Sequence, residues 1–150
     1  MKSTVIARAS QTVTSMKPLI DADLAANTNP FVQFAVVNLG ANDVVAGLPA
    51  EAAWEADLGY ILDAIKVKWP AAKVYVMRPW RRYYAAGCNT LAGWIATVVG
   101  ARAAWAFVGP DERVFLENGD NGATYTDDGV HPNAAGYSLT AAQWIAVLGY

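Results

Sequence analysis

Charged residues, cysteine and histidine are all scarce in this 150-residue chain. Charged side chains make up 16% of the residues, with a formal net charge of −2, one cysteine and one histidine. Nucleic-acid binders need a stripe of positive charge along the phosphates, so this balance argues against a nucleic-acid partner. Cys88 alone cannot form an internal disulfide, and with one imidazole it cannot build a zinc site from soft ligands. The sequence therefore implies no structural metal.

Long hydrophobic runs are also missing, although hydrophobic residues make up 55% of the chain. No run reaches the length of a membrane span, and residues 5–7 behind Lys2 are too few for the core of a signal peptide. The sequence assigns no cellular compartment. Its length predicts a single domain over residues 1–150 with a substantial core. The apolar composition also predicts an association surface, and we expect a homo-oligomer.

Four short apolar runs predict β-strands, and helical patterns separate them. The predicted strands are Thr4–Ala7, Phe31–Val37, Lys73–Met77 and Arg113–Leu116. The clearest helix follows Pro49 and stops at Pro70, with an apolar stripe on one face. Other helices are predicted over Lys17–Ala26, from Asn89 to about Val99, and from Pro132–Asn133 to about Leu148. This alternation is typical of an α/β fold, a parallel sheet covered by helices on both faces.

The residues that follow the strands are the first place to look for chemistry, because open α/β sheets bind ligands beyond the carboxyl ends of their strands. His131 is the sole histidine, so any imidazole acting as a general base must be this one. Asp128, three residues earlier, is placed to orient its ring. The same segment also reads as an ordinary turn that opens the last helix.

A second polar cluster, residues 38–43, follows the predicted strand Phe31–Val37. Gly40 permits a tight turn there, and the amide of Asn42 can donate to an oxygen that gains negative charge during acyl transfer. By itself this cluster is equally typical of turn and cap residues.

Taken together, Gly40-Ala41-Asn42-Asp43 and Asp128-Gly129-Val130-His131-Pro132-Asn133 resemble two segments of the SGNH/GDSL hydrolase family, in the same chain order. The resemblance extends from about Phe31 to Tyr150. It implies a flavodoxin-like three-layer α/β/α fold with a parallel sheet. It also implies carboxylic-ester hydrolysis without a cofactor, as in esterases, lipases and carbohydrate deacetylases. Asn42 would supply an oxyanion donor, and Asp128 and His131 would be the acid and base of a triad.

One family segment is missing from the pattern, because the chain contains no Gly-Asp-Ser. In one alignment, Thr4–Ala7 is the family's second strand, Ala9 and Ser10 belong to the oxyanion-side turn, and the first strand is absent or replaced. In the other, Thr4–Ala7 is the nucleophile strand and Ser10 the nucleophile. We favour the first alignment, which leaves an apolar gap in the sheet for another copy of the chain to cover.

Arg78 opens a loop of arginine and aromatic residues, 78–84, after the strand Lys73–Met77. Guanidinium groups and aromatic faces suit a sugar or an anionic acyl portion, so Arg78 is a candidate substrate-binding residue. A packed loop with extended arginines is the alternative. The predicted function is that of a carboxylic-ester hydrolase acting on a small-molecule or carbohydrate ester. The competing hypothesis is a truncated or degenerate, non-catalytic domain of the same fold that oligomerises or binds a ligand.

Overall fold

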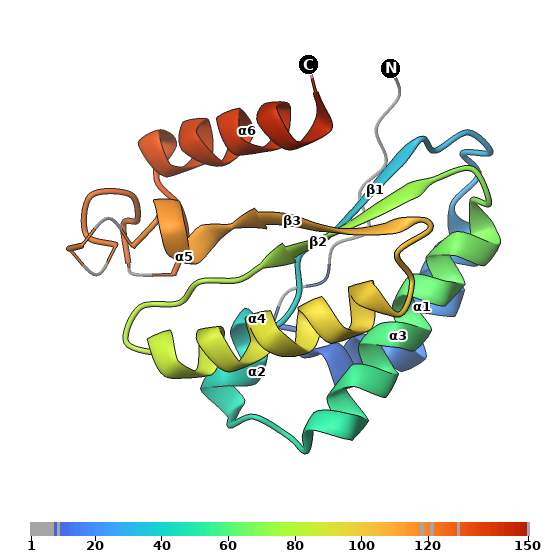
Figure 1. Ribbon diagram of the computed structural model, residues 1–150, viewed down its shortest axis with the longest axis horizontal. Helices are drawn as coiled ribbons and strands as arrows, with labels where there is room; N and C mark the ends of the chain where they lie inside the picture. Colours follow the sequence, from blue (N-terminus) through green and yellow to red (C-terminus); the bar gives the residue numbers. More distant parts are fainter. Residues whose placement is uncertain (1–7, 9, 118, 121, 129, 150) are drawn as a thin grey trace.

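The centre of the computed structural model is a parallel β-sheet (Figure 1), and the structure describes residues 8, 10–117, 119–120, 122–128 and 130–149. Within this part of the chain, the sheet contains β1 (Phe34–Val37), β2 (Lys73–Arg78) and β3 (Ala106–Asp111) in the order β1-β2-β3. Ala35 pairs with Val74, and Val74 pairs with Ala106. The predicted strand Thr4–Ala7 lies outside the described residues.

Helices cover both faces of the sheet, which confirms the predicted three-layer α/β/α fold. In Figure 1, α1 (Val13–Ala26), α3 (Glu51–Lys68) and α4 (Ala85–Gly100) lie below the sheet, and α6 (Ala134–Leu148) lies above it. Both α3 and α4 contact β2, α1 packs on α3, and α6 contacts β3. Two short helices, α2 (Ala41–Ala46) and α5 (Glu112–Phe115), directly follow β1 and β3.

Two apolar clusters fill the space between these layers. The larger one lies between the sheet and the lower helices, where the predicted stripe of α3 packs with the strand residues Val74 and Val76. The smaller cluster lies toward α6 and contains Met77, Trp80, Phe115 and Leu116, with Tyr125, Leu139 and Trp144 packed against it. Burial of this apolar surface is the main source of stability that holds the strand ends in place.

The predicted strand Arg113–Leu116 is wrong, because these residues form most of α5 and its C-cap. The strand is Ala106–Asp111, immediately before them. Gly109 and Pro110 read as a turn in the sequence, yet β3 pairs only with β2 among the described strands, so proline's missing N–H is tolerated. Gly109 is required by packing, because a Cβ there would lie 2.8 Å from the Trp144 ring.

The other predicted elements that lie within the described residues are confirmed with shifted boundaries. The helix predicted from Lys17 begins at Val13, the one predicted from Asn89 begins at Ala85, and β1 begins at Phe34. No helix within the described ranges is both long and apolar enough to cross a membrane.

Candidate active site

The candidate site residues follow the carboxyl ends of the three strands. Gly40 and Asn42 follow β1, Arg78 ends β2, and the loop with Asp128 and His131 follows β3 and α5. In Figure 1, β2 and β3 run toward the same side of the molecule, where the loop between α5 and α6 lies. This is the edge at which open α/β sheets bind ligands.

Gly40 and Asn42 are held in place by close contacts. Gly40 has φ of 113°, and a Cβ there would lie 3.0 Å from Leu91 Cδ1 and 3.2 Å from Pro79 Cγ. Only glycine fits this turn without strain. Asn42 Nδ2 donates a hydrogen bond to the Gln11 carbonyl at 3.1 Å, which fixes the orientation of the amide. An amide nitrogen carries two N–H groups, and the second donates to none of the described residues.

Asp43 ties the start of α1 to α2 and α3, a role that the sequence did not indicate. Its side chain is 2% exposed, and both carboxylate oxygens lie 3.2 Å from the Val13 N–H, which donates to them. The indole N–H of Trp54 donates to the same carboxylate at 2.9 Å. Burial raises the pKa of Asp43, and these hydrogen bonds oppose that rise. The only sign of this role in the sequence was the position of Asp43 between a predicted turn and an apolar run.

Ser10 adopts a left-handed backbone conformation, with φ of 58°. Such a conformation is uncommon for a residue with a side chain and is most easily adopted by glycine. Ala9, the other candidate in this turn, lies outside the described residues.

Asp128 and His131, the candidate acid and base, contact each other, and their catalytic roles stay a prediction. Asp128 Oδ2 lies 2.7 Å from His131 Nδ1, and Asp128 Oδ1 accepts the backbone N–H groups of Val130 and His131, each at 2.8 Å. The backbone N–H and the ring of His131 lower the pKa of Asp128, with a further contribution from Val130. The His131 side chain is 75% exposed. A carboxylate at Nδ1 favours the tautomer with its proton there, which leaves Nε2 as the basic nitrogen.

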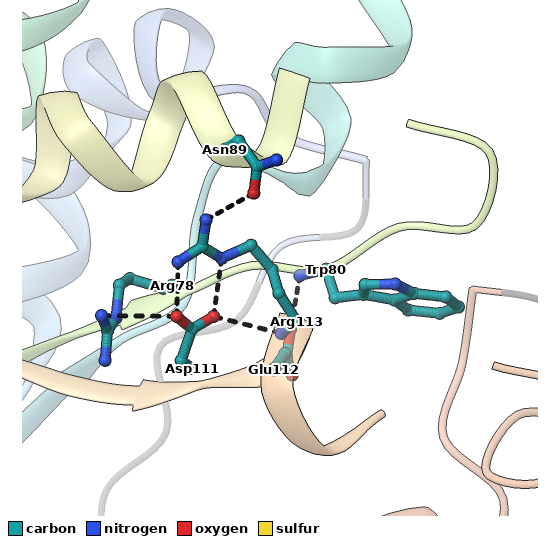
Figure 2. Close-up of polar contacts among 6 residues, drawn as sticks. All are labelled: Arg78, Trp80, Asn89, Asp111, Glu112 and Arg113. Carbon is teal, nitrogen blue, oxygen red and sulfur yellow. Dashed lines mark hydrogen bonds and ion pairs between the residues drawn. The ribbon is translucent and has the colours of Figure 1, made fainter. Parts of the chain in front are cut away.

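Arg78 is engaged in an ionic cluster at the ends of β2 and β3 (Figure 2). Its guanidinium lies 3.3 Å from Asp111 Oδ2. Arg113 Nε donates to Asp111 Oδ1 at 2.7 Å, and Arg113 Nη1 donates to Asn89 Oδ1 at 2.6 Å. Burial acts to raise the pKa of Asp111, but the hydrogen bond from Arg113 and the charges of both arginines outweigh it and lower the pKa. Substrate binding by Arg78 stays a prediction.

Glu112 lies beside this cluster and is another buried acid that the sequence did not single out. Its carboxylate accepts the backbone N–H of Trp80 at 3.2 Å (Figure 2), and burial raises its pKa to about 7. A glutamate at the first position of a four-residue helix carries no sequence signal of burial.

The described polar contacts connect these candidates in three separate sets: the hydrogen bonds of Asn42 with Gln11 and of Asp128 with His131, and the ion pair of Arg78 with Asp111. No hydrogen bond between described residues joins His131 to Asn42 or to Ser10. Convergence of Gly40, Asn42, Asp128 and His131 on one cleft stays a prediction.

The described residues form a parallel sheet with polar loops at its carboxyl edge, and an aspartate–histidine pair precedes the last helix. This is the arrangement of an SGNH-type α/β hydrolase. The sequence profile of the GDSL-like lipase/acylhydrolase family matches residues 3–139. The chain belongs to this family.

Solved structures with the same fold are similar to this chain at low sequence identity. A carbohydrate esterase family 3 protein from Talaromyces cellulolyticus has a TM-score of 0.73 and 21% identity, with 93% of this chain and 67% of that chain covered. A GDSL-like lipase from Bacteroides thetaiotaomicron has a TM-score of 0.68 and 22% identity, with coverages of 93% and 72%. A family 3 carbohydrate esterase from Clostridium thermocellum has a TM-score of 0.62 and 17% identity, with 91% of this chain and 64% of that chain covered. No curated protein matches the sequence.

Proposed function

We propose that this protein hydrolyses carboxylic esters, with His131 as general base, Asp128 as the group that orients it, and Asn42 as an oxyanion donor. The observation that carries the proposal is the 2.7 Å contact between Asp128 Oδ2 and His131 Nδ1 in a member of this hydrolase family. Since His131 is the sole histidine, no other imidazole competes for the role.

In the proposed reaction, His131 Nε2 takes the proton of a hydroxyl nucleophile as that hydroxyl attacks the ester carbonyl. The carbonyl oxygen becomes an oxyanion that the Asn42 amide stabilises. Collapse of the tetrahedral intermediate breaks the bond to the alcohol, which leaves with the proton from His131. Water then attacks the acyl group by the same route. Asp128 stabilises the imidazolium formed in each half-reaction.

We propose that Ser10 belongs to the oxyanion-side turn and is not the nucleophile. The left-handed backbone of Ser10 supports this assignment, because the family's second segment carries an oxyanion-hole glycine and Ser10 adopts a glycine-like conformation. Turnover is then expected to be weak unless a nucleophile is supplied.

Carbohydrate esters are the proposed substrate class, as for the two family 3 carbohydrate esterases with this fold. The loop after β2 is consistent with a sugar ligand, since Tyr83 and Tyr84 are exposed and the Arg82 guanidinium lies 4.9 Å from the centre of the Tyr83 ring. Aromatic and guanidinium groups of this kind contact sugar rings and their substituents.

Hydroxylamine provides a test, because it can act as the supplied nucleophile and converts an ester to a hydroxamate and an alcohol. With an acetylated xylo-oligosaccharide, we expect the protein to accelerate hydroxamate formation above the buffer rate. His131→Ala should remove most of this acceleration, and Asn42→Ala should lower it by about 10²–10³. Ser138→Ala, on α6, is the control that should behave as the unmodified protein.

A fluorophosphonate probe, which reacts with activated serines, tests the assignment of Ser10. We expect no labelling. Stoichiometric labelling that disappears in both Ser10→Ala and His131→Ala would instead make Ser10 the nucleophile. If hydroxamate formation equals the buffer rate, the domain is non-catalytic and the proposed function is wrong.

A further inference from the structure

The loop between α5 and α6 carries the Asp128–His131 pair, and much of its structure is organised around one carbonyl. Gly122 accepts three hydrogen bonds through its carbonyl oxygen: from Tyr125 N at 3.2 Å, Thr126 N at 3.0 Å and Thr126 Oγ1 at 2.8 Å. The Gly122 N–H donates to the Glu117 carbonyl at 3.0 Å. The position of Gly122 therefore sets the position of the residues that precede Asp128.

A short series of backbone contacts continues from Thr126 to His131. Thr126 forms an isolated antiparallel bridge with Pro132. The Asp127 N–H donates to the His131 carbonyl at 3.3 Å, and the Asn133 N–H donates to the Tyr125 carbonyl at 2.9 Å. These contacts close the loop on itself, so a displacement of Gly122 would be transmitted to the aspartate–histidine pair.

Gly122 in turn lies directly against the indole ring of Trp80. A Cβ at position 122 would lie 2.1 Å from Cη2 and 2.7 Å from Cζ2 of Trp80, distances that no real side chain tolerates. The backbone of the loop therefore packs on the ring with no space between them. The φ of Gly122, 76°, also requires glycine at this position.

Trp80 is itself firmly held, which makes it a suitable support. Its side chain is buried in the cluster with Met77, Phe115 and Leu116. Its backbone N–H donates to the Glu112 carboxylate at 3.2 Å, and its indole extends away from the Arg78 cluster in Figure 2. Trp80 thus connects the ends of β2 and β3 to the loop that follows α5.

We propose that Trp80 is a positioning residue for the Asp128–His131 pair, acting through the contact between its indole ring and Gly122. The inference rests on the proposed function only for the chemical role of the pair. The contact between Asp128 and His131, and its dependence on Trp80, can be measured without any substrate.

The pair can be observed directly by NMR, because one histidine gives one set of imidazole signals in a long-range ¹H–¹⁵N spectrum. In the unmodified protein, we expect the Nδ1-protonated tautomer, held by Asp128. Asp128→Ala removes the acceptor and provides the reference spectrum for a broken pair. We expect Trp80→Ala to give a spectrum close to that reference, while the methyl signals of the larger apolar cluster, between the sheet and the lower helices, stay unchanged.

Two glycines of the same loop provide a matched comparison that leaves Trp80 in place. Gly122 and Gly119 both have left-handed φ, 76° and 69°, but a Cβ at position 119 would meet nothing within 4 Å. The backbone strain of an alanine is therefore similar at the two positions, and only Gly122→Ala collides with the indole. We expect Gly122→Ala to lose the Nδ1-protonated signal and Gly119→Ala to retain it.

The inference is overturned if Gly122→Ala and Gly119→Ala give the same spectrum as the unmodified protein, or if the folded Trp80→Ala variant keeps the Nδ1-protonated tautomer. If Trp80→Ala does not fold, the spectra of Gly122→Ala and Gly119→Ala test the inference in its place. A protein without esterase activity whose spectra follow the expected pattern would contradict the proposed function and leave the positioning role intact.

Discussion

Glu112 is buried at the end of β3, and its pKa is raised from 4.5 to about 7 because burial disfavours the carboxylate. Between these two values, the folded protein keeps a proton that the unfolded chain has lost. The free energy of unfolding therefore falls as the pH rises through this range. A shift of this size corresponds to about 3 kcal/mol.

We predict that Glu112→Gln removes most of this pH dependence. Glutamine keeps an oxygen for the Trp80 N–H and cannot ionise. Urea unfolding at pH 5 and pH 8 measures the effect: between these pH values, the free energy of unfolding should fall by about 2–3 kcal/mol more in the unmodified protein than in the variant. Equal losses in both proteins would contradict the assignment of a neutral Glu112 at pH 5.

Asp43 provides a second prediction at the scale of single residues. Asp43→Ala removes the acceptor of the Val13 N–H and the Trp54 N–H, both buried, and each unsatisfied donor costs about 1–3 kcal/mol. We expect the free energy of unfolding in urea to fall by about 2–5 kcal/mol. Asp23→Ala is the control, because Asp23 pairs with Arg8 at the surface, where an ion pair contributes little. Similar losses in both variants would contradict the role assigned to Asp43.

Among the secondary-structure elements, α3 was predicted well and β3 was not, for physical reasons. Pro49, Pro70 and the apolar stripe of α3 are local signals, and they suffice to define a helix. In β3, Gly109 and Pro110 are local signals for a turn, but the strand accommodates them at a register shift between the pairs Val76–Val108 and Arg78–Asp111. Likewise, Val114, Phe115 and Leu116 have strand-like composition, and they become helical because Asp111 caps the turn by accepting the Arg113 N–H.

Gly109 therefore gives a prediction for the packing of α6 on β3. A Cβ at this position would lie 2.8 Å from Trp144 Cη2 and 3.2 Å from the Val76 carbonyl oxygen, so Gly109→Ala must displace the helix or the strand. In thermal unfolding, the free energy of unfolding should fall by about 1–3 kcal/mol. Gly93→Ala on α4 is the matched control, since nothing lies within 4 Å of its Cβ. It should stabilise by up to about 1 kcal/mol, and an equal loss in both variants would exclude the packing explanation.

At the scale of the whole molecule, the sequence predicted the α/β fold with its parallel sheet and placed Asp128 within reach of His131, whereas the catalytic roles of this pair stay a prediction. The pair could be predicted because its two members are three residues apart and open a helix. Asp43, Glu112 and the contact of Trp80 with Gly122 could not be predicted. Their roles depend on which distant segments pack together, and neither spacing nor composition encodes that information.

Self-association is the prediction that concerns the whole molecule. The helix α6 contains no charged residue, and Tyr137, Ile145 and Val147 on it are exposed, as is Val36 on β1. Because such uncharged apolar surface favours association, we expect light scattering to detect a dimer or larger species. Ile145→Glu, at a residue 53% exposed, should shift the distribution toward monomer.

The control for this experiment is Val67→Glu on α3, at a residue 80% exposed on the opposite side of the sheet. Its distribution should match that of the unmodified protein. A monomer at all concentrations, or an equal effect of the two charges, would exclude α6 as the association surface.

The parallel sheet also has a consequence for how the chain folds. Between β1 and β2 the chain forms α2 and α3, and between β2 and β3 it forms α4, so at least one helix separates each strand from its partner along the chain. Pairings of such high contact order form slowly, because a long loop must close before any strand contact forms. During synthesis on a ribosome, the apolar strand Phe34–Val37 emerges well before Lys73–Arg78 and has no partner from the described sheet in the meantime. This interval is when the chain is most exposed to aggregation, and a chaperone that shields β1 would have its largest effect on yield there.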